Sequence, residues 1–549
     1  MLSTLDWFVV AGYFVAVFSV AFWMTRRAAT RASAAGYFLG GRNAGWFVIG
    51  ASLFASNIGS EHLVGLAGTA AASGVAVGQF EILASLILLL LGWLFVPFYL
   101  RSGVFTMPEF LERRYGPAAR WYLAIISIVG YVLTKISVTI AAGGIVFEAL
   151  MGIDFWTGAF VVVVATGIYT VFGGLRAVLY TDLLQMFVLV GGAIAVTLIG
   201  LDAVGGWGAL YQTAGGEFFD MWRPMADPDF PWTGILFGAP ILGVWYWCTD
   251  QFIVQRVLSA RDLDNARRGT IFGAFLKLLP LFLFVIPGVI AYALSQQGAL
   301  TLGRPDEALP TLIATLLPTG VRGLVVAGLI AALMSSLSSV FNSCSTMITW
   351  DLYRKIRPQA SERQLVWVGQ ASTAVLVALG LLWIPMIRLI SGQLYQYLQS
   401  VQAYISPPIA AVFLLGIFWR RVNAQGAVAS LATGFVIGIA RLVAELNKSA
   451  LESGPLLFFA GINFLHFAVV LFVICAAVLI IVSLLTPPPD PDRIAGLTLQ
   501  SSDPRPPASE TEDRAPADLA SDPSWRRTDR LLSVLVIIGV AATWYYFRA

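Results

Sequence analysis

The stretch Gly50-Ala-Ser-Leu-Phe-Ala-Ser-Asn-Ile-Gly-Ser-Glu-His62 places polar and ionisable residues inside an apolar run that extends from about Gly45 to Ala72. Apolar runs of this length are typical of membrane-spanning helices. A carboxylate and an imidazole at that depth are costly unless they line a wet cavity. Because Ser-Asn-Ile-Gly-Ser is also a poor helix-forming sequence, we predict that the helix breaks at Ser56–Ser60. The backbone groups freed by such a break must face a ligand or other protein groups.

The composition predicts an all-α polytopic membrane protein. The chain has 549 residues, of which 58% are hydrophobic and 12% charged, and its mean hydropathy is +0.79. Soluble domains carry roughly twice that charged fraction. A net charge of +3 gives no basic field for nucleic acid, so we expect no nucleic-acid partner. The three cysteines lie in apolar runs and show neither a disulfide nor a zinc-binding spacing.

Runs of about 20 apolar residues predict about 14 transmembrane helices. They lie near residues 4–24, 45–72, 75–100, 120–150, 155–173, 177–203, 232–256, 269–296, 322–349, 365–388, 394–419, 424–445, 462–485 and 530–547. Arg26, Arg27, Arg31 and Arg42 follow the first run, which lacks a basic segment before it and therefore reads as a span, not a cleaved signal peptide. The positive-inside rule then places both termini outside a plasma (inner) membrane.

Two further segments shape the predicted organisation. The run 232–256 is interrupted by Gly243 and by Trp245-Tyr-Trp-Cys-Thr-Asp-Gln251. Two broken helices five spans apart indicate a binding site between two inverted five-helix halves. Residues 486–528 are dominated by Pro, Ser, Asp and Ala, which predicts a disordered cytoplasmic linker before the last span.

Few polar residues lie at membrane depth, and as a set they suit a polyhydroxylated ligand. They are Asn57, Glu61, His62, Glu81, Lys135, Asp182, Asp250, Lys277, Asn342 and Gln399. These side chains supply both hydrogen-bond donors and acceptors. Nearby aromatic residues could cover the C–H face of a sugar: Phe80, Trp245, Tyr246, Trp247, Tyr395 and Tyr397. For each polar residue, a structural ion pair or hydrogen bond within the bundle remains the alternative.

The motif Ala332-Leu-Met-Ser-Ser336 indicates a cation site. Ala332, Ser335 and Ser336 share one helix face because they are spaced i, i+3 and i+4. Their oxygen atoms, together with carbonyls freed near Ala55–Ile58, could form a cage that suits Na⁺ better than Ca²⁺, since no carboxylate belongs to it. Ordinary helix–helix contacts through serine are the alternative.

Eight segments make the chain resemble the sodium/solute symporter family, and within it the sodium/glucose cotransporter branch. They are Gly50–His62, Gly92-Trp-Leu-Phe-Val-Pro, Thr106-Met-Pro-Glu-Phe-Leu, Leu179-Tyr-Thr-Asp-Leu-Leu-Gln, Trp245–Gln251, Ala332–Asn342, Ser391-Gly-Gln and Pro407-Pro-Ile-Ala-Ala-Val-Phe. The resemblance implies a leucine-transporter-type fold with an inverted five-helix repeat. The expected parts are an extra helix at 1–25, a first repeat at 44–203, a second at 231–419, two peripheral helices at 424–485, the linker at 486–528 and a last helix at 529–549.

The resemblance also implies functional roles for particular residues. The implied sugar site comprises Asn57, His62, Glu81, Tyr246, Lys277 and Gln399. The implied gate comprises Tyr246, Trp247 and Phe80, and the implied sodium site comprises Ala55, Ile58, Ala332, Ser335 and Ser336. Asp182 and Ser338 match a second sodium site, although Asp182 could instead pair with an arginine on the cytoplasmic side.

These expectations describe a Na⁺-coupled symporter that imports a hexose such as glucose or galactose by alternating access. A symporter of another polyol such as myo-inositol, or a sugar-gated sensor without net uptake, are the alternatives. We do not expect an enzyme, because the sequence contains no nucleophile elbow, phosphate-binding loop or metal-ligand cluster. The expected partners are the sugar, sodium and the lipid bilayer; the sequence does not indicate an oligomeric state.

Overall fold

The computed structural model describes residues 2–27, 42–59, 61–387, 394–451, 454–499 and 522–548. Ser60, the Ser391–Gln393 motif, Arg31 and most of the expected linker lie outside these ranges. The described residues form helices and no strand; one isolated bridge joins Ala44 to Ala260. Ten of the described helices are long and apolar enough to cross a membrane. The expectation of a helical membrane protein is confirmed, whereas the expected count of about 14 spans is not.

The first helices contain the predicted break. Helix α1 spans Thr4–Arg27, and α3 spans Trp46–Asn57 and ends where Ile58 leaves the helical conformation (φ −77°, ψ 81°). A π-helical segment, Glu61–Leu66, resumes the path and leads into α4 (Ala67–Ser73). Helices α5 (Gln79–Leu90) and α6 (Val96–Ser102) follow, joined by the π-helical segment Leu91–Phe95. The break therefore falls at the predicted Ser56–Ser60 stretch.

The next helices differ from the predicted spans at one place. Helices α7 (Met107–Tyr115), α8 (Pro117–Tyr131) and α9 (Ser137–Val146) precede α10, which runs without interruption from Phe155 to Val204. The predicted spans 155–173 and 177–203 are thus one continuous helix of 50 residues. Only its second part, Leu179–Val204, has the length and hydropathy of a span by itself. Gly173 and Gly174, at the junction of the predicted spans, each cost a helix only about 1 kcal/mol, too little to end it.

The second broken helix is built from three helices and a π-helical segment. After α11 (Gly206–Ala214), helices α12 (Trp232–Phe237) and α13 (Ala239–Gly243) continue into the π-helical segment Val244–Thr249. Asp250 is extended (φ −78°, ψ 127°), and its side chain caps α14 (Gln251–Leu258) by accepting from the amide of Phe252. The interruption expected in this span is therefore at Asp250.

The remaining helices complete the bundle and its surroundings. They are α15 (Leu263–Leu276), α16 (Ile286–Gln296), α17 (Ala308–Leu316), α18 (Val321–Met347), α19 (Arg354–Ile356), α20 (Glu362–Ile387), α21 (Leu394–Phe418), α22 (Ala424–Leu446), α23 (Pro455–Gly461), α24 (Phe464–Leu485), α25 (Pro491–Ile494) and α26 (Pro523–Tyr546). Helix α18 is buried along almost its whole length, whereas α24 and α26 expose most of theirs. The bundle thus has α18 at its centre and an apolar outer surface that suits lipid.

The expected disordered linker differs from the structure at both ends. Residues 486–499 include α25 and bury Ile494 and Leu497, and the amide of Leu499 donates to the carbonyl of Ile417 at 3.0 Å. Residues 523–528 belong to α26. Two buried apolar side chains inside a Pro- and Asp-rich segment are enough to anchor it, which the average composition does not reveal. Residues 500–521 lie outside the described ranges.

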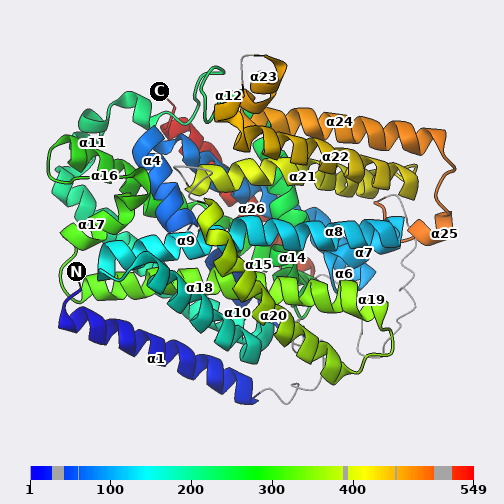
Figure 1. Cartoon of the computed structure of the whole chain (residues 1–549), viewed down its shortest axis with the longest axis horizontal. Coiled ribbons are helices and arrows are strands. Elements are labelled where there is room, and N and C mark those ends of the chain that lie inside the picture. Colours follow the sequence, from blue (N-terminus) through cyan, green and yellow to red (C-terminus); the bar gives the residue numbers. More distant parts are fainter. Residues whose placement is uncertain are drawn as a thin grey trace.

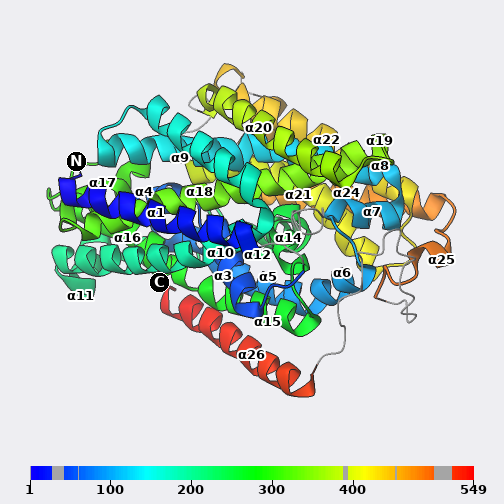
Figure 2. The ribbon, with the colours of Figure 1, turned by 90° about the horizontal axis from the view of Figure 1, so that it is seen from below.

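The helices run between two ends of the molecule, which Figures 1 and 2 show at the right and left. Helices α7, α19 and α25 lie at one end, and α11, α17 and both chain termini lie at the other (Figure 1). Helix α26 lies along one flank beside α15 (Figure 2). The broken segments of α3 and of the α13–α14 path meet in the middle, where both contact α18 or α21.

Candidate functional site

The break after α3 changes the hydrogen-bond partners of the backbone carbonyls around it. In a continued helix the amide of Gly59 would donate to the carbonyl of Ala55, but it donates to Asn57 at 2.9 Å. The amide of His62 would likewise reach Ile58, but it donates to Gly59 at 3.1 Å. The carbonyl groups of Ala55 and Ile58, which the sequence analysis assigned to a sodium ion, are therefore released from helical pairing by the break.

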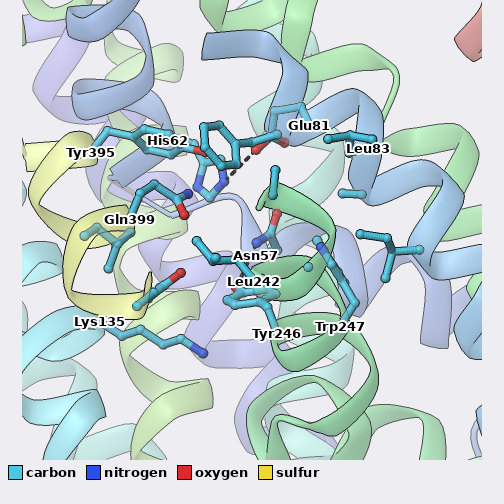
Figure 3. A pocket seen from close by; sticks show the side chains of 17 residues that line it. Asn57, His62, Glu81, Leu83, Lys135, Leu242, Tyr246, Trp247, Tyr395 and Gln399 are labelled. Carbon is cyan, nitrogen blue, oxygen red and sulfur yellow. Dashed lines mark hydrogen bonds and ion pairs between the residues drawn. The ribbon is translucent and has the colours of Figure 1, made fainter. Parts of the chain in front are cut away.

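A buried pocket opens beside these breaks. Its lining comes from α3, the segment after it, α5, the π-helical segment Val132–Ile136, α13 with its π-helical extension, and α21 (Figure 3). Five of the six residues expected to bind sugar line this pocket, as do the expected gate residues Phe80 and Trp247; the five are Asn57, His62, Glu81, Tyr246 and Gln399. The sixth, Lys277, does not line the pocket but donates to Glu81 and Asn57, which do. The structure thus brings together side chains that are up to 342 positions apart in the chain (399 − 57).

A buried ion pair includes one residue of the pocket lining, Glu81. The ammonium of Lys277 donates to Oε2 of Glu81 and to Oδ1 of Asn57. His62 Nε2 lies 3.2 Å from the other Glu81 oxygen, and Asn57 Nδ2 donates to the hydroxyl of Tyr246 at 2.8 Å. Glu81 is 3% exposed and Lys277 1%. A buried ion pair is an expensive way to hold helices together, so its presence at a pocket favours a role in binding over one in stability.

Aromatic rings lie at two opposite ends of this pocket. At one end, Phe80 and Tyr395 meet at 6.0 Å between ring centroids, and Tyr395 also contacts His62 at 5.9 Å. At the other end, Tyr246 and Trp247 meet at 5.1 Å (Figure 3). Among the three expected gate residues, Phe80 therefore contacts Tyr395, whereas Tyr246 and Trp247 contact each other.

One charged pair, which includes the pocket-lining Lys135, was not assigned from the sequence. Lys135 Nζ lies 2.6 Å from Asp250 Oδ2, and the Lys135 ammonium also lies over the rings of Tyr246, at 4.4 Å, and Phe252, at 4.0 Å. Both members were noted as polar residues at membrane depth, but nothing in the sequence pairs residues 115 positions apart. Gln402 also lines the pocket, and its i+3 spacing from Gln399 is the signal that could have found it.

The expected first sodium site brings α18 against the broken end of α3. The hydroxyl of Ser336 donates to the carbonyl of Ser56 at 3.1 Å, and Ser339 donates to the hydroxyl of the same residue at 3.1 Å. Ser336 is therefore beside the released carbonyls. Ser335 points instead to Asp182, to which its hydroxyl donates. The structure places Ser335 between the two expected ion sites.

Asp182 lies fully buried in a cluster of serine hydroxyls. Ser52 and Ser56 donate to its Oδ2 at 2.6 and 2.9 Å, and Ser335 donates to its Oδ1. Arg256 Nε donates to Ser56 at 2.8 Å, and the charge of Arg256 also interacts with the Asp182 carboxylate. Ser338, the other expected member, donates to the carbonyl of Ser335 at 2.9 Å. The sequence analysis did not identify Ser52 and Ser56 as partners of Asp182, although their i, i+4 spacing puts them on one face of α3.

The arrangement suits ion-coupled transport. Oxygen atoms freed by a helix break lie against serine hydroxyls on one side, and a charged, hydrogen-bonding pocket lies on the other, all at the depth of apolar spans. Two discontinuous helices around such a pocket are the usual architecture of secondary transporters.

Comparisons with known proteins agree with this class. The sodium:solute symporter family matches residues 37–434, so the chain belongs to that family. It is 41% identical to sodium/glucose cotransporter 1 of Oryctolagus cuniculus, over 87% of this chain and 78% of the relative. It is 42% identical to a sodium/mannose cotransporter of Bos taurus, over 90% and 89%, and 40% identical to a sodium/myo-inositol cotransporter of Mus musculus, over 91% and 76%.

The fold is also similar to a solved structure. A Na⁺-coupled sialic acid symporter in a substrate-bound, outward-open state is 25% identical and superposes with a TM-score of 0.74, covering 88% of this chain and 99% of that one.

Proposed function

We propose that this protein is a Na⁺-coupled symporter that imports a hexose, such as glucose or galactose, by alternating access. The family and the relatives named for sodium and sugars support sodium as the coupling ion and a sugar as the cargo. The protein works in a lipid bilayer as a multi-pass membrane protein. Transport by this route needs no covalent step, in keeping with a family of transporters and not enzymes.

The single observation that carries the proposal is the network formed by Glu81, Lys277, Asn57 and His62 in the pocket. A carboxylate, an ammonium, an amide and an imidazole can each exchange a hydrogen bond with the network for one with a sugar hydroxyl. We assign sugar binding to Asn57, His62, Glu81, Tyr246, Lys277 and Gln399, and sodium binding to Ala55, Ile58, Ala332, Ser335 and Ser336. Phe80 covers the pocket at one end, and Tyr246 with Trp247 covers it at the other.

The organisation we propose is that of two inverted repeats. Residues 44–203 and 231–419 would form the repeats, each opening with a broken helix; 1–25, 424–485 and 529–549 would add helices around them. The proposed orientation has both termini outside the cell membrane. In its support, α7, α19 and α25 carry Arg113, Lys355 and Arg493 at one end, and both termini lie at the opposite end (Figure 1).

Uptake into proteoliposomes tests this function. Purified protein in vesicles with an inward sodium gradient is given a panel of labelled sugars that includes glucose, galactose, mannose and myo-inositol. We expect a hexose to accumulate only with sodium. Preference for myo-inositol would favour the polyol alternative, which the inositol relative supports. Sugar-gated current without accumulated sugar would favour the sensor.

The sodium assignment predicts a loss of ion affinity in Ser336→Ala. This change removes the hydroxyl beside the Ser56 carbonyl. Loss of one oxygen ligand at about 1.4 kcal/mol weakens apparent sodium affinity about tenfold. Apparent sugar affinity must fall too, because coupling between two ligands is reciprocal. The measurement is the sodium dependence of uptake. The matched control is Ser345→Ala, further along α18, whose hydroxyl donates to the carbonyl of Gly369 in α20. Equal uptake in choline and sodium buffers would exclude sodium coupling.

The gate assignment predicts different results for two changes at Tyr246. Tyr246→Phe keeps the ring and removes the hydroxyl that accepts a hydrogen bond from Asn57, so sugar affinity should fall about fivefold with accumulation retained. Tyr246→Ala removes the ring and should lower the accumulation ratio by more than its effect on affinity. Accumulation at fixed sodium gradient measures this, with the exposed Tyr545→Ala as control. Identical accumulation in Tyr246→Ala and wild type would mean that the ring only packs.

A further inference from the structure

The pocket has one wall without hydrogen-bonding side chains. This wall is formed by Leu83, Ala84 and Ile87 of α5 and by Ala239, Leu242 and Gly243 of α13. Apart from Leu398 of α21, the other pocket residues carry amide, carboxylate, imidazole, ammonium or phenol groups, or aromatic rings. A ligand that fills the pocket therefore meets polar or aromatic groups in most directions and its main hydrocarbon surface at the wall of α5 and α13.

Two residues of this apolar wall fit each other closely. A Cβ atom built on Gly243 would lie 2.1 Å from Cδ1 of Ile87 and 3.5 Å from its Cγ1, and no other heavy atom would lie within 4 Å apart from its own helix and chain neighbours. The end of the Ile87 side chain thus occupies the space that a side chain at position 243 would use. Gly243 is partly exposed towards the pocket, and Ile87 is 6% exposed.

The contact between Ile87 and Gly243 determines whether this wall can present a hydrogen-bonding side chain to a ligand. A serine or threonine at position 243 would present a hydroxyl to the pocket, but only if Ile87 were shorter or turned away. With glycine and isoleucine in place, a substrate hydroxyl directed at this wall loses water and gains no side-chain partner. Leaving a buried hydroxyl unpaired is costly, whereas a hydrogen atom or a methyl group there is favourable.

We infer that the contact between Ile87 and Gly243 is a specificity determinant and that the protein accepts sugars lacking one hydroxyl group. This inference rests on the proposed sugar symport and names the substrate class within it. The hydroxyl that faces the apolar wall is dispensable, so the deoxy sugar with hydrogen or methyl at that position is transported at least as well as the parent hexose. The hydroxyls that face Glu81, Lys277, Asn57 and Gln399 are required.

The test on the wild-type protein is competition by each singly deoxygenated analogue of the best-transported hexose, measured in proteoliposomes with sodium. We expect one analogue to compete with an affinity equal to or better than that of the parent, and each of the others to lose about fivefold or more. The inference is overturned if every analogue loses affinity to a similar extent. Absence of sodium-dependent uptake for every sugar would instead overturn the proposed function itself.

Paired variants identify the wall as the cause. In Ile87→Ala combined with Gly243→Ser, the new hydroxyl has room and should make the dispensable hydroxyl matter, so the favoured deoxy analogue loses its advantage by about fivefold. The single Ile87→Ala variant opens the space without adding a partner and should keep the wild-type order of analogues. Val436→Ala, an exposed position on α22, is the control for expression and reconstitution. If the analogues keep the same order of affinity in the double variant, the dispensable hydroxyl does not face this wall and the inference is contradicted.

Discussion

Glu81→Gln is expected to abolish concentrative sugar uptake, with apparent sugar affinity reduced by at least about 100-fold. The carboxylate is the shared partner of Lys277 and His62 and an acceptor for sugar hydroxyls in the proposed site. The neutral amide can accept one hydrogen bond but cannot balance the Lys277 charge, which is 1% exposed. Breaking a buried ion pair by removing one partner costs about 3–5 kcal/mol, enough to affect both folding and binding.

A second variant separates the two effects of this change. Glu81→Gln combined with Lys277→Met removes both charges, and replacing a buried pair by neutral groups is often harmless to stability. We therefore expect the double variant to regain thermal stability in detergent while transport stays absent. The exposed Glu148→Gln is the matched control and should behave as wild type. Recovery of transport along with stability would show that the pair only holds α5 and α15 together.

The sequence predicted the features that depend on local chemistry. The break in α3 could be predicted because Ser-Asn-Ile-Gly-Ser combines poor helix formers with polar groups inside an apolar run. The candidate pocket could be assembled because ionisable residues at membrane depth are rare, so Glu81, Lys277 and His62 stood out individually. Their assignment to one site came from the resemblance to a family.

Features that depend on tertiary contacts could not be predicted. The continuity of α10 and the packing of Ile494 against the bundle are set by neighbouring helices, which override local propensity. The ion pair between Lys135 and Asp250 could not be predicted, because the two residues are far apart in the sequence. Likewise, the close fit of Ile87 to Gly243 follows from the approach of α5 to α13, not from either residue alone.

The second large effect expected is a change in charge stoichiometry in Asp182→Asn. Asp182 is fully buried, and its hydrogen bonds come from the hydroxyls of Ser52, Ser56 and Ser335. Hydroxyl donors do not neutralise a carboxylate. Because a buried charge needs a counter-charge, either Arg256, which reaches Ser56, or a second sodium ion must supply it. We propose the sodium ion, with the hydroxyls of Ser335 and Ser338 turning from their present acceptors towards it.

The number of charges moved per sugar, obtained from reversal potentials in proteoliposomes, decides whether Arg256 or a second sodium ion is the counter-charge of Asp182. We expect two charges per sugar in the wild type, falling towards one in Asp182→Asn and in Ser338→Ala, because either change removes an oxygen from the second site. Ser345→Ala should keep the wild-type ratio, since its hydroxyl bonds to Gly369 away from the cluster. A wild-type ratio of one charge per sugar would rule out the second ion. Asp182 would then serve as the buried counter-charge of Arg256, and the serine cluster would join α3, α10 and α18 without binding a cation.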